Sequence, residues 1–236
     1  MFACGGFLHT ISPARTCRVL TSVLFVRVVL LCCLLAHASV RVASVSVSEL
    51  FPFGPSVNDN QTDREDDGGS GEIRLTIDFP FFGRSHDKIY VNNNGVISFV
   101  AELTTYRPSN FPLQQEIPII APYWADVYLV NSSGNVWFRE TRDPAMLNKA
   151  TQEIGTLFAI KNFRAKWVFV ATWDEVGFYG AELEGKNKRN TFQAVLALDV
   201  THKMSFVILN YAKIDWTTGA NSQGDPTTGL GGSPAQ

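Results

Sequence analysis

Cysteine is missing from most of this chain. The sequence has 236 residues and four cysteines, and all four lie in the first 38 residues: Cys4, Cys17, Cys32 and Cys33. The remaining part therefore cannot contain a disulfide scaffold, a zinc-thiolate site or a cysteine nucleophile. A hydrophobic core must hold it together, and a chain of this length can provide one.

Acidic residues are absent from the same first 38 residues, whose only charges are three arginines. An uninterrupted apolar run, Val28–Ala36, is followed by Ala36-His37-Ala38, which has small residues at the two positions that a signal peptidase reads. We therefore expect residues 1–38 to be a signal peptide that is cleaved between Ala38 and Ser39, which makes the protein secreted.

An uncleaved signal anchor at the cell surface is the alternative, because Val19–Ala36 is an 18-residue, mostly apolar stretch. Arg27 disfavours it, since a charge near the middle of a span costs about 3 kcal/mol. No later segment approaches transmembrane length, so no stable membrane span is expected in the mature chain.

An excess of basic residues is also lacking. Without the leader, the chain has 17 basic and 22 acidic residues and a net charge of −5. Its one basic cluster, Lys186, Lys188 and Arg189, lies in a polar segment that is typical of a solvated loop. We therefore expect no nucleic-acid partner.

Catalytic constellations are missing as well. Only His86 and His202 follow the leader, and there is no Gly-x-Ser-x-Gly elbow and no complete phosphate-binding loop. The expectation is a protein that is not an enzyme, with no catalytic residue and no cofactor.

Strand patterns dominate what is present. Ile73–Phe79 alternates apolar and polar residues, as a strand with one solvated face does. Ile89–Phe99 consists of two apolar runs around an Asn-rich turn, whose Asn94-Gly95 step suits the positive φ angles of a tight hairpin. A polar turn, Arg84–Lys88, is predicted between them.

The rest of the chain supplies more strands and a single helix. Asp143 is placed to cap a helix that we predict over Pro144–Lys161, with Pro144 in its first turn. Residues 39–49 are expected to be an N-terminal arm, either an edge strand or flexible, and Thr104–Pro118 a long loop. Further strands are predicted at Val136–Glu140, Lys166–Trp173, Asn190–Val200 and Ser205–Tyr211. The prediction is a mainly β (α+β) fold, an antiparallel β-sandwich-like domain over residues 50–236 with one long helix.

An acidic loop between Asn58 and Gly71 invites a calcium interpretation, because hard cations prefer clustered carboxylates. Its acids are Asp59, Asp63, Glu65, Asp66 and Asp67. The spacing does not fit an EF-hand, so a solvated loop is favoured and no metal site is expected. Asp126 and the pair Asp174-Glu175, each beside a tryptophan, are alternative ligands or an acid/base pair, although turn capping at strand ends is the favoured role.

Two N-glycosylation sequons occur in predicted loops, at Asn60-Gln61-Thr62 and Asn131-Ser132-Ser133. Asn60 and Asn131 are expected to carry glycans if the chain is secreted.

Several motifs in a fixed order resemble a nidogen-like (NIDO) domain over roughly Leu50 to Gln236. They are Phe51-Pro52-Phe53-Gly54, Asp66-Asp67-Gly68, Phe79-Pro80-Phe81-Phe82-Gly83, Tyr90–Phe99, Pro122-Tyr123-Trp124-Ala125-Asp126, Val136–Glu140, Thr172–Val176 and Asn190–Gln193. Tectorin-like versions and those associated with sushi and EGF-like repeats are the most similar. Such a domain usually runs further, so we expect this one to be truncated at its C-terminus.

The resemblance implies a non-enzymatic module of extracellular matrix and cell-surface proteins that serves in cell–matrix adhesion or matrix assembly. Its partners would be matrix or cell-surface proteins, bound through loops and an exposed aromatic or sheet-edge surface. The alternative is a calcium-dependent module, using Asp63–Asp67, that binds glycoproteins or carbohydrate.

Overall fold

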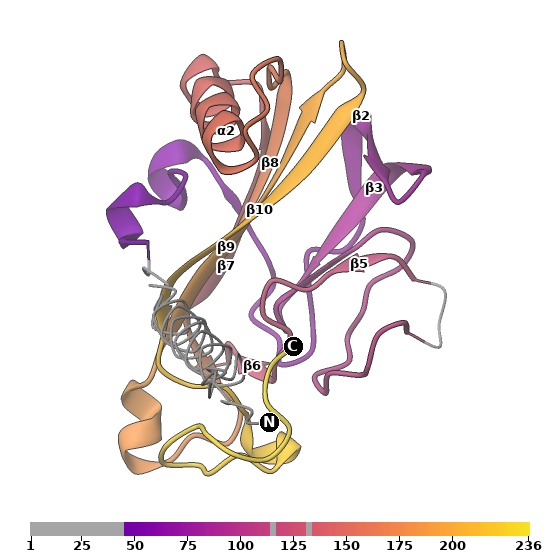
Figure 1. Cartoon of the computed structure of the whole chain (residues 1–236). Helices are drawn as coiled ribbons and strands as arrows, with labels where there is room; N and C mark the ends of the chain where they lie inside the picture. Colours follow the sequence, from indigo (N-terminus) through magenta and orange to yellow (C-terminus); the bar gives the residue numbers. More distant parts are fainter. Residues whose placement is uncertain (1–44, 114–116, 131–133) are drawn as a thin grey trace, which may run out of the picture. The chain divides into compact units, whose positions relative to one another are not determined.

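The computed structural model describes residues 45–113, 117–130 and 134–236 (Figure 1). The expected signal peptide, its cleavage site at Ala38 and Ser39, most of the N-terminal arm and the sequon residue Asn131 lie outside the described residues.

Two antiparallel sheets form the domain (Figure 1). The larger has the order β1 (Asn60–Gln61), β7 (Asn135–Thr141), β8 (Trp167–Phe178), β9 (Asn190–Asp199) and β10 (Met204–Ile214), with β6 (Val127–Tyr128) paired to β8. The smaller has the order β2 (Ile73–Phe81), β3 (Arg84–Asn92), β4 (Val96–Ser98) and β5 (Ile119–Ile120). The predicted mainly β, sandwich-like fold with one long helix is confirmed.

Aromatic side chains fill the space between the sheets. Phe79 of β2 stacks on Phe99 with ring centroids 6.1 Å apart and lies 5.8 Å from Trp167 of β8. Trp173 of β8 stacks on Phe192 of β9 at 4.9 Å, and all five rings are almost fully buried. Burial of such rings removes large apolar areas from water, so this core holds the sandwich together without disulfides.

The helix α2 (Pro144–Leu157) covers the outer face of the larger sheet (Figure 1). It begins where the sequence predicts, since Asp143 Oδ1 accepts hydrogen bonds from the backbone N–H of Ala145 and Met146. It ends four residues before the predicted Lys161. Because α2 covers one face of β8 and β9 and the smaller sheet covers the other, both strands are buried on two sides.

Two local predictions were wrong. Arg84–Lys88 is not a turn but the first part of β3, and the connection is the two-residue turn Phe82-Gly83. The strand predicted to end at Trp173 runs to Phe178, through Asp174 and Glu175. The arm was expected to be either an edge strand or flexible, and among its described residues Val47–Glu49 forms a short 3-10 helix.

Four other predictions hold. The hairpin within Ile89–Phe99 forms, with Tyr90 opposite Ser98 and Asn92 opposite Val96. The β9–β10 hairpin also forms, and Val136–Glu140 lies within β7. The described residues between Thr104 and Pro118 contain no helix or strand.

Candidate functional site

The Asn-rich turn between β3 and β4 is buried and connects three parts of the domain. Asn92, Asn93 and Asn94 are each at most 1% exposed. Asn92 Oδ1 accepts a hydrogen bond from the backbone N–H of Leu103 at 2.7 Å, and its Nδ2 donates to the carbonyl oxygen of Val96. A buried amide side chain requires such partners, so this turn is a structural anchor and not an exposed hairpin tip.

Gly95 completes the turn because no other residue fits. Its φ is +79°, in the left-handed region that glycine adopts at low cost. A Cβ atom at this position would lie 1.9 Å from the carbonyl oxygen of Tyr123. The segment that contains Asp126 therefore packs directly against the turn.

The acidic loop is fastened to the same turn. Asn93 Nδ2 donates to the carbonyl oxygens of Asp63 and Glu65 at 3.0 and 2.9 Å, and Asn93 N–H donates to that of Gly68 at 2.8 Å. Asn94 Nδ2 donates to Oδ1 of Asp67 at 2.7 Å. The loop that sequence reasoning treats as solvated is held in one conformation by buried amides.

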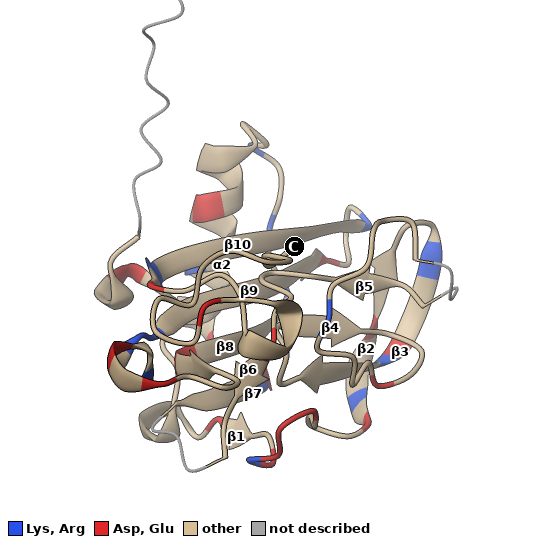
Figure 2. Ribbon diagram, turned by 90° about the horizontal axis from the view of Figure 1, so that it is seen from below, with Lys and Arg blue, Asp and Glu red and all other residues tan. Residues whose placement is uncertain are grey.

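Three carboxylates from two distant segments meet beside this turn. One oxygen each of Asp66, Asp67 and Asp126 lies within 4.8 Å of the others, and these three residues are hereafter the acidic cluster. Asp126 is 2% exposed. Figure 2 shows the acidic segment that follows β1, from which Asp66 and Asp67 come.

Burial and mutual repulsion disfavour ionisation in the acidic cluster. Burial is the largest cause that raises the pKa of Asp126 to about 7, followed by the charges of Asp66 and Asp67, while Arg107 lowers it. Burial and the charge of Asp67 also raise the pKa of Asp66. A cluster of this kind needs a proton or a cation to balance it.

A second feature is an exposed aromatic residue at the tip of the β2–β3 hairpin. Phe82 is 92% exposed and has a φ of +44°, followed by Gly83 at +76°. A two-residue hairpin loop with both φ angles positive favours Asn, Asp or Gly, and a bulky residue there is an outlier. Phe81 supports the ring of Phe82 in an edge-to-face contact at 4.7 Å.

Phe82 borders an apolar groove of about 420 Å³. Phe111, which is 56% exposed, also lines it, together with Pro112 and Leu113. Among the described residues of the lining, Arg84 is the only charged one. We call Phe82, Phe111 and this groove the aromatic surface.

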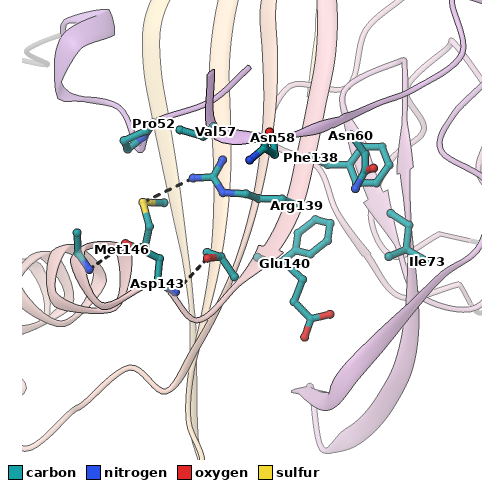
Figure 3. A pocket seen from close by; sticks show the side chains of 13 residues that line it. Pro52, Val57, Asn58, Asn60, Ile73, Phe138, Arg139, Glu140, Asp143 and Met146 are labelled. Atoms are coloured by element: carbon teal, nitrogen blue, oxygen red, sulfur yellow. Dashed lines mark hydrogen bonds between the residues drawn. The ribbon is translucent and has the colours of Figure 1, made fainter. Parts of the chain in front are cut away.

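A groove of about 730 Å³ lies between α2 and strand β7 (Figure 3). Its charged side chains already have partners within the fold. Arg139 pairs with the buried Asp59 at 2.5 Å, Glu140 accepts hydrogen bonds from Thr76 and from Nε1 of Trp167, and Asp143 caps α2. These groups are engaged in holding β2, β7 and α2 in place.

The histidines do not form a triad with a serine in the described part of the chain. Nδ1 of His202 contacts Oδ2 of Asp199 at 2.7 Å in the β9–β10 turn. His86 is buried against Phe99, and burial lowers its pKa. Asp174 and Glu175 form a bulge inside β8 and do not cap a strand end.

Of the sequon residues, Asn60 is described. It is exposed and lies in β1, at the edge of the larger sheet. No helix in the described ranges is long and apolar enough to cross a membrane.

Sequence reasoning missed how the distant residues come together. It weighed Asp126 apart from the loop acids, and it predicted the turn at Arg84–Lys88 rather than at Phe82 and Gly83. The only available signal for Phe82 is the Gly83 that follows it, because a glycine often completes a hairpin turn.

The fold and these surfaces define an antiparallel β-sandwich module. The model of the nidogen-like domain family matches residues 87–236. Alpha-tectorin of Mus musculus is 46% identical over 188 residues, which cover 79% of this chain and 8% of that protein. Nidogen-2 of Mus musculus is 36% identical over 167 residues (67% and 12%), and nidogen of Drosophila melanogaster is 29% identical over 171 residues (70% and 12%).

The chain belongs to the nidogen-like domain family. It spans about a tenth of the length of these curated relatives. No solved structure matches it.

Proposed function

We propose that this chain is a module of a secreted extracellular matrix protein that acts in cell–matrix adhesion or matrix assembly by binding other proteins, without catalysis of its own. Its membership of the nidogen-like family supports a matrix role, because the resemblance associates such modules with matrix proteins. Secretion would follow from cleavage after Ala38, and glycans at Asn60 and Asn131 would accompany it.

The observation that supports the proposal most directly is the exposure of Phe82 at a strained backbone position. An exposed aromatic ring at a left-handed position gains little from packing and pays for backbone strain, which is of order 1 kcal/mol or more. Aromatic side chains in shallow grooves are frequent binding anchors. A phenylalanine at this exposed, strained position therefore favours a partner that covers the aromatic surface.

Phe82→Asn tests this proposal because it separates binding from stability. Asparagine tolerates positive φ, so the variant is expected to unfold at the same urea concentration as the wild type or a higher one. Loss of a central aromatic anchor costs about 2 kcal/mol, which corresponds to roughly 30-fold weaker binding. Binding of the secreted full chain to a basement-membrane preparation and to cells would be measured.

Two further variants serve as controls. Phe82→Tyr keeps the ring and is expected to keep binding. Leu157→Ser removes an apolar side chain that is 65% exposed at the end of α2, away from the aromatic surface, and is also expected to keep binding. The assigned surface is wrong if Phe82→Asn binds like the wild type. The adhesion and assembly function is wrong if the saturating wild-type chain binds no matrix or cell-surface component.

A further inference from the structure

The acidic cluster has no directly paired counter-charge in the described part of the chain. Oδ2 of Asp126 and Oδ1 of Asp66 are buried and have no hydrogen-bond partner among the described residues. Within the same part of the chain, no lysine, arginine or histidine forms an ion pair with any of the three carboxylates. A guanidinium nitrogen of Arg107 donates instead to the carbonyl oxygen of Asn221.

Burial of an unpaired carboxylate costs free energy, and buried carboxylates are therefore usually paired with a cationic side chain, protonated or bound to a metal ion. Here an almost fully buried aspartate, Asp126, faces two further carboxylates on another segment. Three carboxylates that converge in this way form a concentrated set of hard oxygen donors, which suits a hard divalent cation.

We propose that Asp66, Asp67 and Asp126 bind a calcium ion. The three carboxylates offer up to six oxygens, and water or backbone carbonyls would complete the six to eight ligands that calcium takes. Calcium suits the site better than magnesium, because magnesium demands near-ideal octahedral coordination. Here the ligands come from two irregular segments, the acidic loop and the residue directly before β6. Calcium sites of extracellular modules bind with Kd values of about 0.1–1 mM.

Asn94 is the positioning residue of this site. Its Nδ2 donates to Oδ1 of Asp67, and its Oδ1 accepts from the backbone N–H of Val127, which directly follows Asp126. One buried amide thus fixes the spacing between the loop carboxylates and Asp126. It leaves Oδ2 of Asp67 for the ion.

Gly219 keeps room for the carboxylate of Asp126. A Cβ atom at this position would lie 2.6 Å from Cβ and 2.9 Å from Oδ2 of Asp126. The backbone N–H of Tyr179 donates to the carbonyl oxygen of Asp126 at 3.0 Å, which also holds the aspartate in place. An ion bound to the three carboxylates would therefore connect the acidic loop to the segment that directly precedes β6.

The site differs from a calcium site built on Asp63–Asp67. Asp63 and Glu65 are exposed and do not belong to the cluster, whereas Asp126 comes from a segment some 60 residues later. Because Asp126 is buried, the ion is placed within the fold, where it stabilises the domain. The inference does not rest on the proposed adhesion function.

The test is a calcium titration of the secreted full chain after treatment with EDTA and dialysis. Calorimetry should show one ion bound, and the thermal midpoint should rise by about 3–6 °C at a calcium concentration ten times the Kd. Magnesium at the same concentration should raise it less. The absence of calcium uptake in the wild type would overturn the proposal.

Matched variants locate the ion. Asp126→Asn keeps the shape of the side chain, removes one charge from the cluster and should abolish both calcium uptake and the rise in midpoint. Asp66→Asn should do the same and serves as the second variant if Asp126→Asn is not secreted. Asp63→Asn, in the same loop but outside the cluster, should respond like the wild type. Calcium uptake that survives Asp126→Asn and Asp66→Asn, or that is lost in Asp63→Asn, would contradict the site.

Discussion

Asn94→Ala should destabilise the domain far more than the loss of an exposed asparagine would. Asn94 is 1% exposed and forms two hydrogen bonds with its side chain. The bond to Asp67 is charge-assisted and contributes about 1.5–3 kcal/mol. The N–H of Val127 also donates to the carbonyl oxygen of Ala125 at 2.9 Å, so it keeps one acceptor and the loss of its bond to Asn94 costs about 0.5–1.5 kcal/mol. We expect the free energy of unfolding to fall by about 2–4 kcal/mol.

Urea unfolding followed by tryptophan fluorescence measures this loss. Trp173 is a suitable reporter, because it is fully buried and its Nε1 donates to the carbonyl oxygen of Asn93 at 3.0 Å. With an m-value of about 2 kcal/mol/M, the midpoint should fall by about 1–2 M. Asn110→Ala, in an exposed loop, is the matched control and should change the midpoint little.

Asn94→Asp separates the two bonds. The aspartate keeps an oxygen that can accept from Val127 N–H, but it loses the donor to Asp67 and places a further negative charge beside the acidic cluster. It should therefore remain destabilised in the absence of calcium. A loss below about 1 kcal/mol for Asn94→Ala would refute the argument that this side chain anchors the loop.

Substitutions at three further sites have definite expected outcomes. Gly95→Ala places a methyl group against the carbonyl oxygen of Tyr123 at a positive φ, so the yield of folded secreted protein should drop sharply. Arg139→Met leaves the buried Asp59 unpaired and should cost about 3–5 kcal/mol in urea unfolding, part of which Asp59→Asn should restore in the double variant. Burial raises the pKa of Asp199, but hydrogen bonds from the His202 side chain and three backbone N–H groups outweigh this and lower it to about 2. The stability that Asp199 contributes is complete above about pH 4 and is lost as the pH falls through about 2, so Asp199→Asn should flatten the stability profile between these values.

The regular elements were predictable where local pattern and tertiary environment agree. Alternation identified the strand that begins at Ile73 because one of its faces meets the core and the other meets solvent. Asp143 and Pro144 identified the start of α2 because capping is a local interaction. Strands β8 and β9 were recognisable as apolar runs, since both of their faces are covered.

Errors arose where polar residues continue a strand. Arg84–Lys88 was predicted as a turn because it is hydrophilic, yet it pairs with β2 along an exposed part of the sheet. The turn itself is formed by Phe82 and Gly83, and phenylalanine is rare at a positive φ. Asp174 and Glu175 lie inside β8 because they form a β-bulge, which lets the strand continue beyond them. In this bulge Glu175 has a φ of +49° and donates its N–H to Oγ1 of Thr191.

The acidic cluster shows why composition and spacing do not identify a site that tertiary contacts create. The acidic loop has a high density of charge, which in isolation indicates a solvated segment, and Asp126 beside Trp124 indicates a strand end. What changes both interpretations is the buried turn Asn92–Gly95, whose amides bind the loop on one side and the backbone of Val127 on the other. The same Asn-Gly step that predicts a hairpin from sequence therefore also brings three carboxylates together. Oδ1 of Asp66 and Oδ2 of Asp126 are buried there without a hydrogen-bond partner among the described residues, which makes a cation the expected occupant.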